Sequence, residues 1–246
     1  MKYDDIMEES PFKPQFFERE DESPDTAFYE HARLLVHIDE YAIAAARDLY
    51  AELLPPRGAI LDLMSSYRSH MPPGLDPARL AGVGMNEIEL RENDQLTDYL
   101  VKDLNADPYL PYAADAFDGA VVTVSVQYMT RPVEIFRDVA RALKPDAPFI
   151  VTYSNRMFPT KAVRIWRSLD DRERAGLISA YFRHAGAFGE VTAEDRTIPD
   201  GPPHDPLFAV WARKRYLDAL VVARRAVVCN ATVRRPRRSE RNESTT

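Results

Sequence analysis

Short strand-like runs alternate with helical segments along most of the chain, and this alternation restricts the fold more than any other feature. We expect strands at residues 59–64, 80–85, 99–104, 119–126, 148–154 and 205–214. The clearest helix precedes the fifth strand, where Pro132 suits a first turn and Ile135 and Val139 lie one helical turn apart. Strands alternating with helices favour a mostly parallel sheet with helices on both faces, so the expected fold class is α/β.

The two ends of the chain differ from this pattern. Residues 1–23 are polar and charged, and we expect an irregular N-terminal arm there. From Pro24 a helical pattern continues to Leu53, and we expect this helix to cover the domain that extends over residues 24–214. Residues 215–246 are basic and continue neither pattern, so we expect a disordered C-terminal tail.

Composition excludes several classes of protein. The single cysteine, Cys229, rules out an internal disulfide framework and a cysteine-based metal site. The acidic N-terminus lacks the apolar stretch of a secretory signal, and no apolar run reaches membrane-spanning length, so we expect a cytoplasmic protein that binds no membrane. The net charge of −7 combines about +7 from residue 212 onward with about −14 elsewhere. An acidic body disfavours a nucleic-acid partner, while the oligomeric state stays open.

The segment after the first expected strand departs from a nucleotide-binding turn. Ligands of open parallel sheets bind at the carboxyl ends of the strands, and here the strand leads into Asp62. Met64, Ser66 and Arg68 stand where glycines would allow backbone to approach a ligand closely. Residues 71–77 contain three prolines, so the next helix must be short or absent. A pyrophosphate needs backbone N–H groups at a helix start, which weakens a dinucleotide-binding hypothesis.

The second half of the expected sheet carries the most specific pattern in the chain. Asp103, the run Leu110-Pro111-Tyr112, the pair Phe117-Asp118, a strand, a helix and Leu143-Lys144-Pro145 follow in order. This order closely resembles class I S-adenosylmethionine-dependent methyltransferases of the type 11 group, more weakly from Ile60 to Lys214. The resemblance implies a Rossmann-like methyltransferase fold, S-adenosyl-L-methionine as cofactor and a small-molecule substrate.

The resemblance also implies which residues hold the cofactor. Asp62 would bind the ammonium group, directly or through water. The hydroxyls of Ser65, Ser66 and Ser69, with Arg68 or His70, would hold the carboxylate without glycines, and Met64 of the same turn would also contact the cofactor. Asp103 resembles the residue whose side chain meets adenine, and Leu104 would add a backbone N–H. Ser125 and Val126 would face the sulfonium and its methyl group.

The end of the second strand leaves two interpretations open. Family members often place an acid there for the ribose hydroxyls, whereas this chain has Gly84. Asn86 or Glu87 would take that role, or Asn86 would cap a helix with Glu89 as its capping-box partner. The sequence is also similar to a methyltransferase-like variant with Asp-Leu-x-Ser-Ser-x-x-Ser-His after the first strand, which favours an established alternative site.

Candidate catalytic and substrate residues lie at the same sheet edge. His37, expected on the N-terminal helix, is the candidate general base because its ordinary pKa lies near neutrality, although a packing role is the alternative. Tyr128 would act with it or wall the pocket. Ser154, Asn155 and Arg156 would contact substrate. No metal site is expected.

Two functions from different classes follow. The first is methyl transfer from S-adenosylmethionine to a small-molecule acceptor. The alternative keeps the fold without catalysis and acts as a regulatory or interaction module, because function belongs to sites and not to folds.

Overall fold

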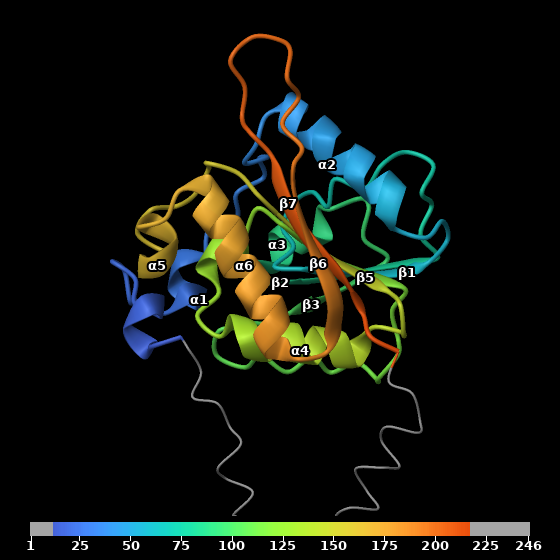
Figure 1. The fold of residues 1–246 in the computed structure, drawn as a ribbon, viewed down its shortest axis with the longest axis horizontal. Helices are drawn as coiled ribbons and strands as arrows, with labels where there is room; N and C mark the ends of the chain where they lie inside the picture. The colour runs from blue at the N-terminus through green and yellow to red at the C-terminus, as the bar shows by residue number, and fades with distance from the viewer. Residues whose placement is uncertain (1–11, 217–246) are drawn as a thin grey trace, which may run out of the picture. The chain divides into compact units, whose positions relative to one another are not determined.

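The computed structural model describes residues 12–216, and these form a seven-stranded sheet in the order β3-β2-β1-β4-β5-β7-β6 (Figure 1). The strands are β1 (Ala59–Leu63), β2 (Arg79–Gly84), β3 (Asp98–Val101), β4 (Gly119–Thr123), β5 (Pro148–Tyr153), β6 (Phe188–Asp195) and β7 (Phe208–Lys214). The first five are parallel, and β7 is antiparallel to both of its neighbours. The predicted α/β fold is confirmed.

Strand β6 is absent from the sequence-based expectation. It forms the edge of the sheet beside β7, and its exposure alternates along the strand. Glu190, Glu194 and Asp195 leave it few apolar residues, so its sequence does not stand out as a strand. Charged side chains on an edge strand also discourage pairing with another chain.

Six α-helices and two 3₁₀ helices connect the described strands. They are η2 (Pro14–Phe17), α1 (Asp25–Phe28), α2 (Glu40–Leu53), α3 (Glu87–Arg91), η3 (Val126–Tyr128), α4 (Pro132–Ala142), α5 (Arg164–Arg167) and α6 (Asp171–Ala185). None of the helices within residues 12–216 has the length and apolar character needed to cross a bilayer. The predicted tail from residue 217 onward lies outside the described residues, as does the arm before residue 12.

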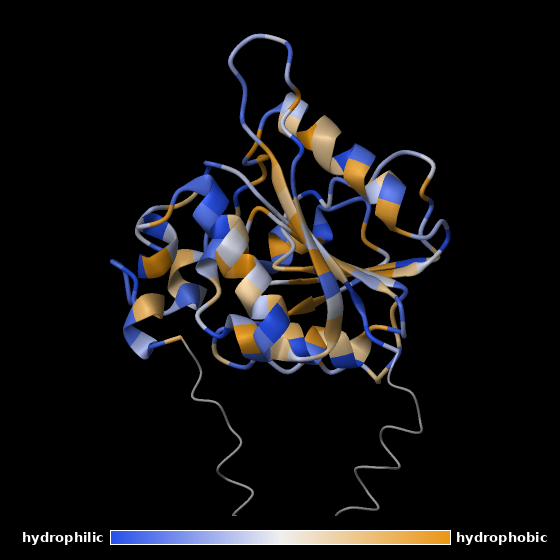
Figure 2. Cartoon of the chain, viewed as in Figure 1, coloured by the Kyte–Doolittle hydropathy of each residue, from blue (hydrophilic) through white to orange (hydrophobic). Residues whose placement is uncertain are grey.

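The sheet separates two apolar cores. Successive residues of a strand point to opposite faces, so Ile60 packs with α2 while Leu61 packs with α4 and α6. Figure 2 shows that the central strands are largely apolar, as the burial of β1, β2, β4 and β5 on both faces requires. On the α2 side, the segment between β1 and β2 forms no helix, as its prolines predict.

The prediction of one long N-terminal helix from Pro24 to Leu53 is wrong. The structure has the short α1 and then a non-helical stretch up to Asp39. Oδ1 of Asp39 accepts the N–H groups of Tyr41 (3.1 Å) and Ala42 (3.0 Å), which starts α2 at Glu40. Leu34 is 49% exposed, so the apolar spacing that included it does not form one helix face.

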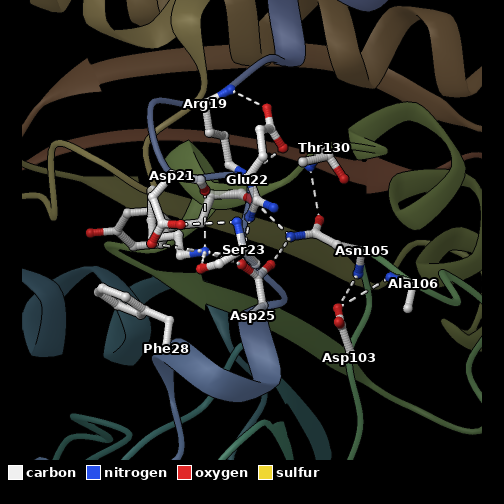
Figure 3. Close-up of polar contacts among 12 residues, drawn as sticks. Arg19, Asp21, Glu22, Ser23, Asp25, Phe28, Asp103, Asn105, Ala106 and Thr130 are labelled. Carbon is white, nitrogen blue, oxygen red and sulfur yellow. Dashed lines mark hydrogen bonds and ion pairs between the residues drawn. The ribbon is translucent and has the colours of Figure 1, made fainter.

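In the structure the N-terminal arm extends beyond the expected residues 1–23: its described part is residues 12–33, which include α1 and lead to the stretch before α2. This arm is anchored to the domain through Lys161, whose side chain is fully buried. Its Nζ donates to the carbonyl oxygens of Ser23 (2.7 Å) and Asp21 (3.2 Å) and lies 3.3 Å from Oδ1 of Asp25. Asp25 in turn accepts from Arg19 (2.6 Å). Figure 3 shows these arm residues gathered in one polar cluster. Because the buried ammonium satisfies backbone oxygens as well as carboxylates, the cluster holds the arm in one position.

We predict that Lys161→Met lowers the free energy of unfolding by about 3 kcal/mol, because it removes one partner from a buried ion-pair cluster. Urea denaturation followed by circular dichroism would measure it. The control is Lys144→Met, which removes a half-exposed partner of Asp118 and should cost no more than about 1 kcal/mol. Equal losses in both variants would contradict the anchoring role.

Candidate functional site

A cavity of about 250 Å³ lies where the parallel strands end. Residues that follow β1, β2, β3 and β4 line it, and residues from the arm and from the stretch before α2 line it as well. The predicted site residues found in its lining are His37, Asp62, Met64, Ser65, Ser66, Asn86, Asp103, Leu104, Ser125, Tyr128 and Arg156. The predicted residues outside its lining are Glu87, Val126, Ser154 and Asn155.

The turn after β1 keeps a glycine-like backbone without glycine. Met64 has φ = 52°, in the left-handed region that side chains other than glycine seldom adopt. The turn then crosses the end of β2, where the Ser65 N–H donates to the Val83 carbonyl at 2.8 Å. A Cβ on Gly84 would lie 2.1 Å from the Ser65 carbonyl oxygen, so only glycine fits there. The turn after β1 therefore explains why an acid is missing at the end of β2: its backbone occupies the space that a side chain at Gly84 would need.

The serine hydroxyls of this turn already have protein partners. Ser65 Oγ donates to Asp62 (2.6 Å), and Ser66 Oγ donates to Glu89 (2.6 Å). Ser69 Oγ accepts from Asn93 at 2.9 Å and does not line the cavity. For Ser65 or Ser66 to donate to a cofactor carboxylate, each hydroxyl would have to leave its present acceptor, so their predicted role stays a prediction.

Asp62 is buried at the end of β1, with 2% of its surface exposed. Burial raises the pKa of its carboxyl group to about 6, and the hydroxyls of Ser65 and Ser69 partly oppose this shift. The group is therefore half ionised near pH 6 and mostly ionised at pH 7. A cationic group entering the cavity would favour the ionised carboxylate.

Helix α3 turns one acid into the cavity and another away from it. Oδ1 of Asn86 accepts the N–H groups of Ile88 and Glu89 at 3.0 Å, so the helix-cap interpretation is confirmed for Asn86. Glu89 does not complete a capping box, since its carboxylate binds Ser66 and the backbone N–H of Arg33 (2.6 Å). Glu87 is exposed. The sequence-based analysis considered Glu89 only for capping, yet it lies buried in the cavity wall.

The loop after β3 presents one carboxylate oxygen without a protein partner. Oδ1 of Asp103 accepts the N–H groups of Asn105 (2.8 Å) and Ala106 (3.1 Å), as Figure 3 shows, which orients the side chain. Its Oδ2 makes no hydrogen bond within residues 12–216 and remains available to a ligand. Asn105 also lines the cavity and donates to Asp25 of the arm and to the Tyr128 carbonyl, both at 2.9 Å. Sequence reasoning missed Asn105 because its role depends on the arm.

After β4 the backbone is again unusual. Val124 has φ = 47°, an outlier for a β-branched residue, and it precedes Ser125 in the cavity wall. Val126 instead packs in the core beside α4. The Tyr128 hydroxyl accepts the Phe158 N–H at 2.8 Å, and burial raises the pKa of Tyr128. The phenol therefore stays protonated at neutral pH.

Two histidines line the cavity, and neither makes a hydrogen bond within the described residues. His37 lies before α2, not on a helix, with its ring edge-on to the Phe158 ring (5.4 Å between centroids). Burial lowers the pKa of His37. His70 is only 7% exposed, and burial together with the charges of Arg47 and Arg68 lowers its pKa to about 4. Both imidazoles are therefore neutral at pH 7.

The loop after β5 contributes one of its three predicted residues. Arg156 lines the cavity, with Nε 2.7 Å from Oδ1 of Asp205. Ser154 is buried and donates to the Pro206 carbonyl (2.6 Å), while Asn155 is exposed away from the lining. No group of three His, Cys, Asp or Glu side chains is arranged to hold a metal ion in the part of the chain that the structure describes.

We predict that Gly84→Ala destabilises the fold by about 1–3 kcal/mol, because its Cβ would collide with the Ser65 carbonyl. The matched control is Gly176→Ala within α6, where an added Cβ meets open space. That change should stabilise the protein by up to about 1 kcal/mol through helix propensity. Thermal unfolding of both variants would distinguish the two effects, and a neutral Gly84→Ala would argue against the crossing turn.

We predict a pH-dependent effect of Asp62→Asn. Because the folded-state pKa of Asp62 is raised to about 6, ionisation removes stability from the wild type as pH rises from about 4 through 6. The loss corresponds to about 3 kcal/mol, which Asn would not suffer. Denaturant titrations should show the free energy of unfolding of the variant rising relative to that of the wild type between pH 4 and pH 8. A constant difference would mean that the carboxyl group is not desolvated.

Comparisons with known proteins agree with the fold. Residues 76–151 match the family model of a methyltransferase domain. An S-adenosylmethionine-dependent methyltransferase from Thermotoga maritima superposes with a TM-score of 0.53 at 16% identity, over 71% of this chain and 90% of that one. A chain of the Haloferax volcanii complex between the Trm112 methyltransferase activator and a methyltransferase gives 0.51 at 14% identity, over 71% and 91%. None of the curated protein sequences matches this chain.

A further structural relative has a different activity. The [4+2]-cyclase SpnF superposes with a TM-score of 0.50 at 17% identity, over 69% of this chain and 80% of that one. At these identities structural likeness concerns the fold, so the cavity must carry the argument about reaction. The matched region spans β2 to β5 and contains the Asp103 loop and the Ser125 turn. The family match over residues 76–151 and the order of the described strands together show that this chain has the fold of S-adenosylmethionine-dependent methyltransferases.

Proposed function

We propose that this methyltransferase domain transfers the methyl group of S-adenosylmethionine to a small-molecule acceptor in the cytoplasm. The observation that supports it best is the single cavity that joins Asp62, Asp103 and Ser125 from three strand ends with His37 near the arm. The cavity of about 250 Å³ and the arm residues in its wall favour a small acceptor over a macromolecular one.

The residues present fit the chemistry of this cofactor. Oδ2 of Asp103, which has no partner within residues 12–216, would accept a hydrogen bond from the adenine amino group. Asp62 would face the ammonium group, which favours its ionised form. When bound, the cofactor supplies an electrophilic methyl group on a sulfonium, and Ser125 lies in the wall that would face it.

The acceptor side of the cavity offers a neutral base. His37 is unprotonated at neutral pH and makes no hydrogen bond with any described residue, so it would take the proton of an acceptor hydroxyl or amine as the methyl transfers. Tyr128 would position the acceptor through its protonated hydroxyl or its ring. Most of the acceleration would come from holding nucleophile and methyl in line.

A second candidate is a non-catalytic module with the same fold. One observation favours it: the hydroxyls of Ser65 and Ser66 are directed to carboxylates and not into the cavity. If these bonds persist, the turn offers the cofactor carboxylate no serine donor. Binding measurements with the cofactor separate the two candidates.

We predict that the protein binds S-adenosylhomocysteine and that Asp103→Ala weakens this binding at least about tenfold, because a hydrogen bond to a charged group is lost. Isothermal titration calorimetry would measure both. Asp48→Ala, a change on the exposed side of α2, is the control and should leave affinity unchanged.

Catalysis has its own readout. Incubation with methyl-labelled S-adenosylmethionine and a small-molecule cell extract should transfer label to a small product, and His37→Gln should reduce the transfer at least about tenfold. Binding without any transfer would favour the non-catalytic module. Absence of binding at millimolar S-adenosylhomocysteine would contradict the proposed cofactor.

A further inference from the structure

Among the residues that the structure describes, Arg33 is the one Lys or Arg side chain of the cavity wall without an ion pair. Four cationic Lys and Arg side chains line the cavity, and three of them have carboxylate partners: Arg68 with Asp94, Lys102 with Asp107 and Arg156 with Asp205. Arg33 has no ion pair with any residue that the structure describes. An arginine in a partly buried position is normally paired, so this one calls for an explanation.

The position of the Arg33 side chain is well defined. Its guanidinium lies over the rings of Phe28 (4.7 Å to the centroid), Phe158 (5.4 Å) and Tyr29 (5.8 Å). Two of its N–H groups donate to the carbonyl oxygens of Phe28 (3.1 Å) and His31 (3.3 Å). Because a guanidinium carries five N–H groups, three remain for a ligand. The aromatic contacts hold its plane in place without neutralising its charge.

Nearby protein carboxylates are directed elsewhere. Glu89 accepts from the backbone N–H of Arg33 and from Ser66, and makes no ion pair with the guanidinium. Asp25 is held by Arg19, Lys161 and Asn105. The cavity therefore contains one oriented fork of N–H donors that has no carboxylate partner within residues 12–216, the geometry that binds a carboxylate with two parallel hydrogen bonds.

We propose that Arg33 is the carboxylate-binding residue of this cavity and that its partner is a carboxylate brought by a ligand. Two ligands of the proposed function could carry that group, namely the amino-acid end of the cofactor and an acidic small-molecule acceptor. This inference rests on the proposed function for the cofactor, but the unpaired guanidinium is an observation independent of it. The serine turn is then not required to supply the donors for that carboxylate.

The experiment compares two nucleosides that differ in this group. S-adenosylhomocysteine carries the carboxylate, whereas 5′-methylthioadenosine keeps the adenosine and thioether without the amino-acid end. If Arg33 binds the cofactor carboxylate, Arg33→Gln should weaken S-adenosylhomocysteine about 10- to 100-fold and leave 5′-methylthioadenosine unchanged. Unchanged binding of the second ligand also shows that the variant cavity is folded. Arg33→Lys keeps the charge but not the fork, so its affinity for S-adenosylhomocysteine should lie between those of the wild type and Arg33→Gln.

A second set of titrations, the benzoate arm of the experiment, tests whether the acceptor is the source of the carboxylate. Benzoate and its neutral isostere benzamide are titrated into the protein, alone and saturated with S-adenosylhomocysteine. If the acceptor brings the carboxylate, the wild type should prefer benzoate and Arg33→Gln should lose that preference, with both nucleosides binding as before. Arg172→Gln, the same charge change on an exposed residue of α6, is the control in both arms and should change nothing.

The outcomes separate this inference from the proposed function. A loss of carboxylate discrimination in either arm supports the assignment and names the source. Retention of wild-type affinity for both carboxylates in Arg33→Gln, or no preference for a carboxylate in the wild type, overturns it. Failure of the wild type to bind either nucleoside contradicts the proposed cofactor, while the benzoate arm still decides the role of Arg33.

Discussion

The crossing of the turn after β1 over the end of β2 is the contact on which the site depends. The hydrogen bond from Ser65 N–H to the Val83 carbonyl holds the turn against Gly84, and the left-handed Met64 directs it there. This arrangement places Met64, Ser65 and Gly84 in the cavity wall and leaves no room for an acid at the end of β2. Polar groups for a ligand must then come from other segments, and the structure supplies them from α3, the β3 loop and the arm.

Charge in the cavity follows from this geometry. The buried carboxyl of Asp62 has a pKa raised to about 6, and the neutral His70 has a pKa lowered to about 4, both chiefly because water is excluded. Asp62 therefore titrates just below neutral pH, where a bound ligand would bias its charge, while His70 stays neutral. An ammonium group would favour the ionised form of Asp62, and the guanidinium of Arg33 can bind an anion. The cavity is thus suited to a zwitterionic ligand.

Sequence alone predicts much of the fold and part of the site. Five parallel strands, the helix from Pro132, the missing helix after β1 and the cap at Asn86 depend on local patterns and were confirmed. Strand β6 was not predicted, because this edge strand carries few apolar residues. The predicted cofactor residues of the turn line the cavity, yet the partners of their hydroxyls could not be inferred, because Glu89 and Asn93 approach from a different element.

What the sequence by itself determined is the α/β architecture and the strand ends at which a ligand would bind, because both follow from periodicity and from the order of motifs along the chain. Only the tertiary structure decided which side chains meet there. Asn105 and Arg33 acquire their roles from the arm, which Lys161 anchors across more than a hundred residues of chain. Such contacts depend on burial and on distance in space, and neither is encoded in local spacing.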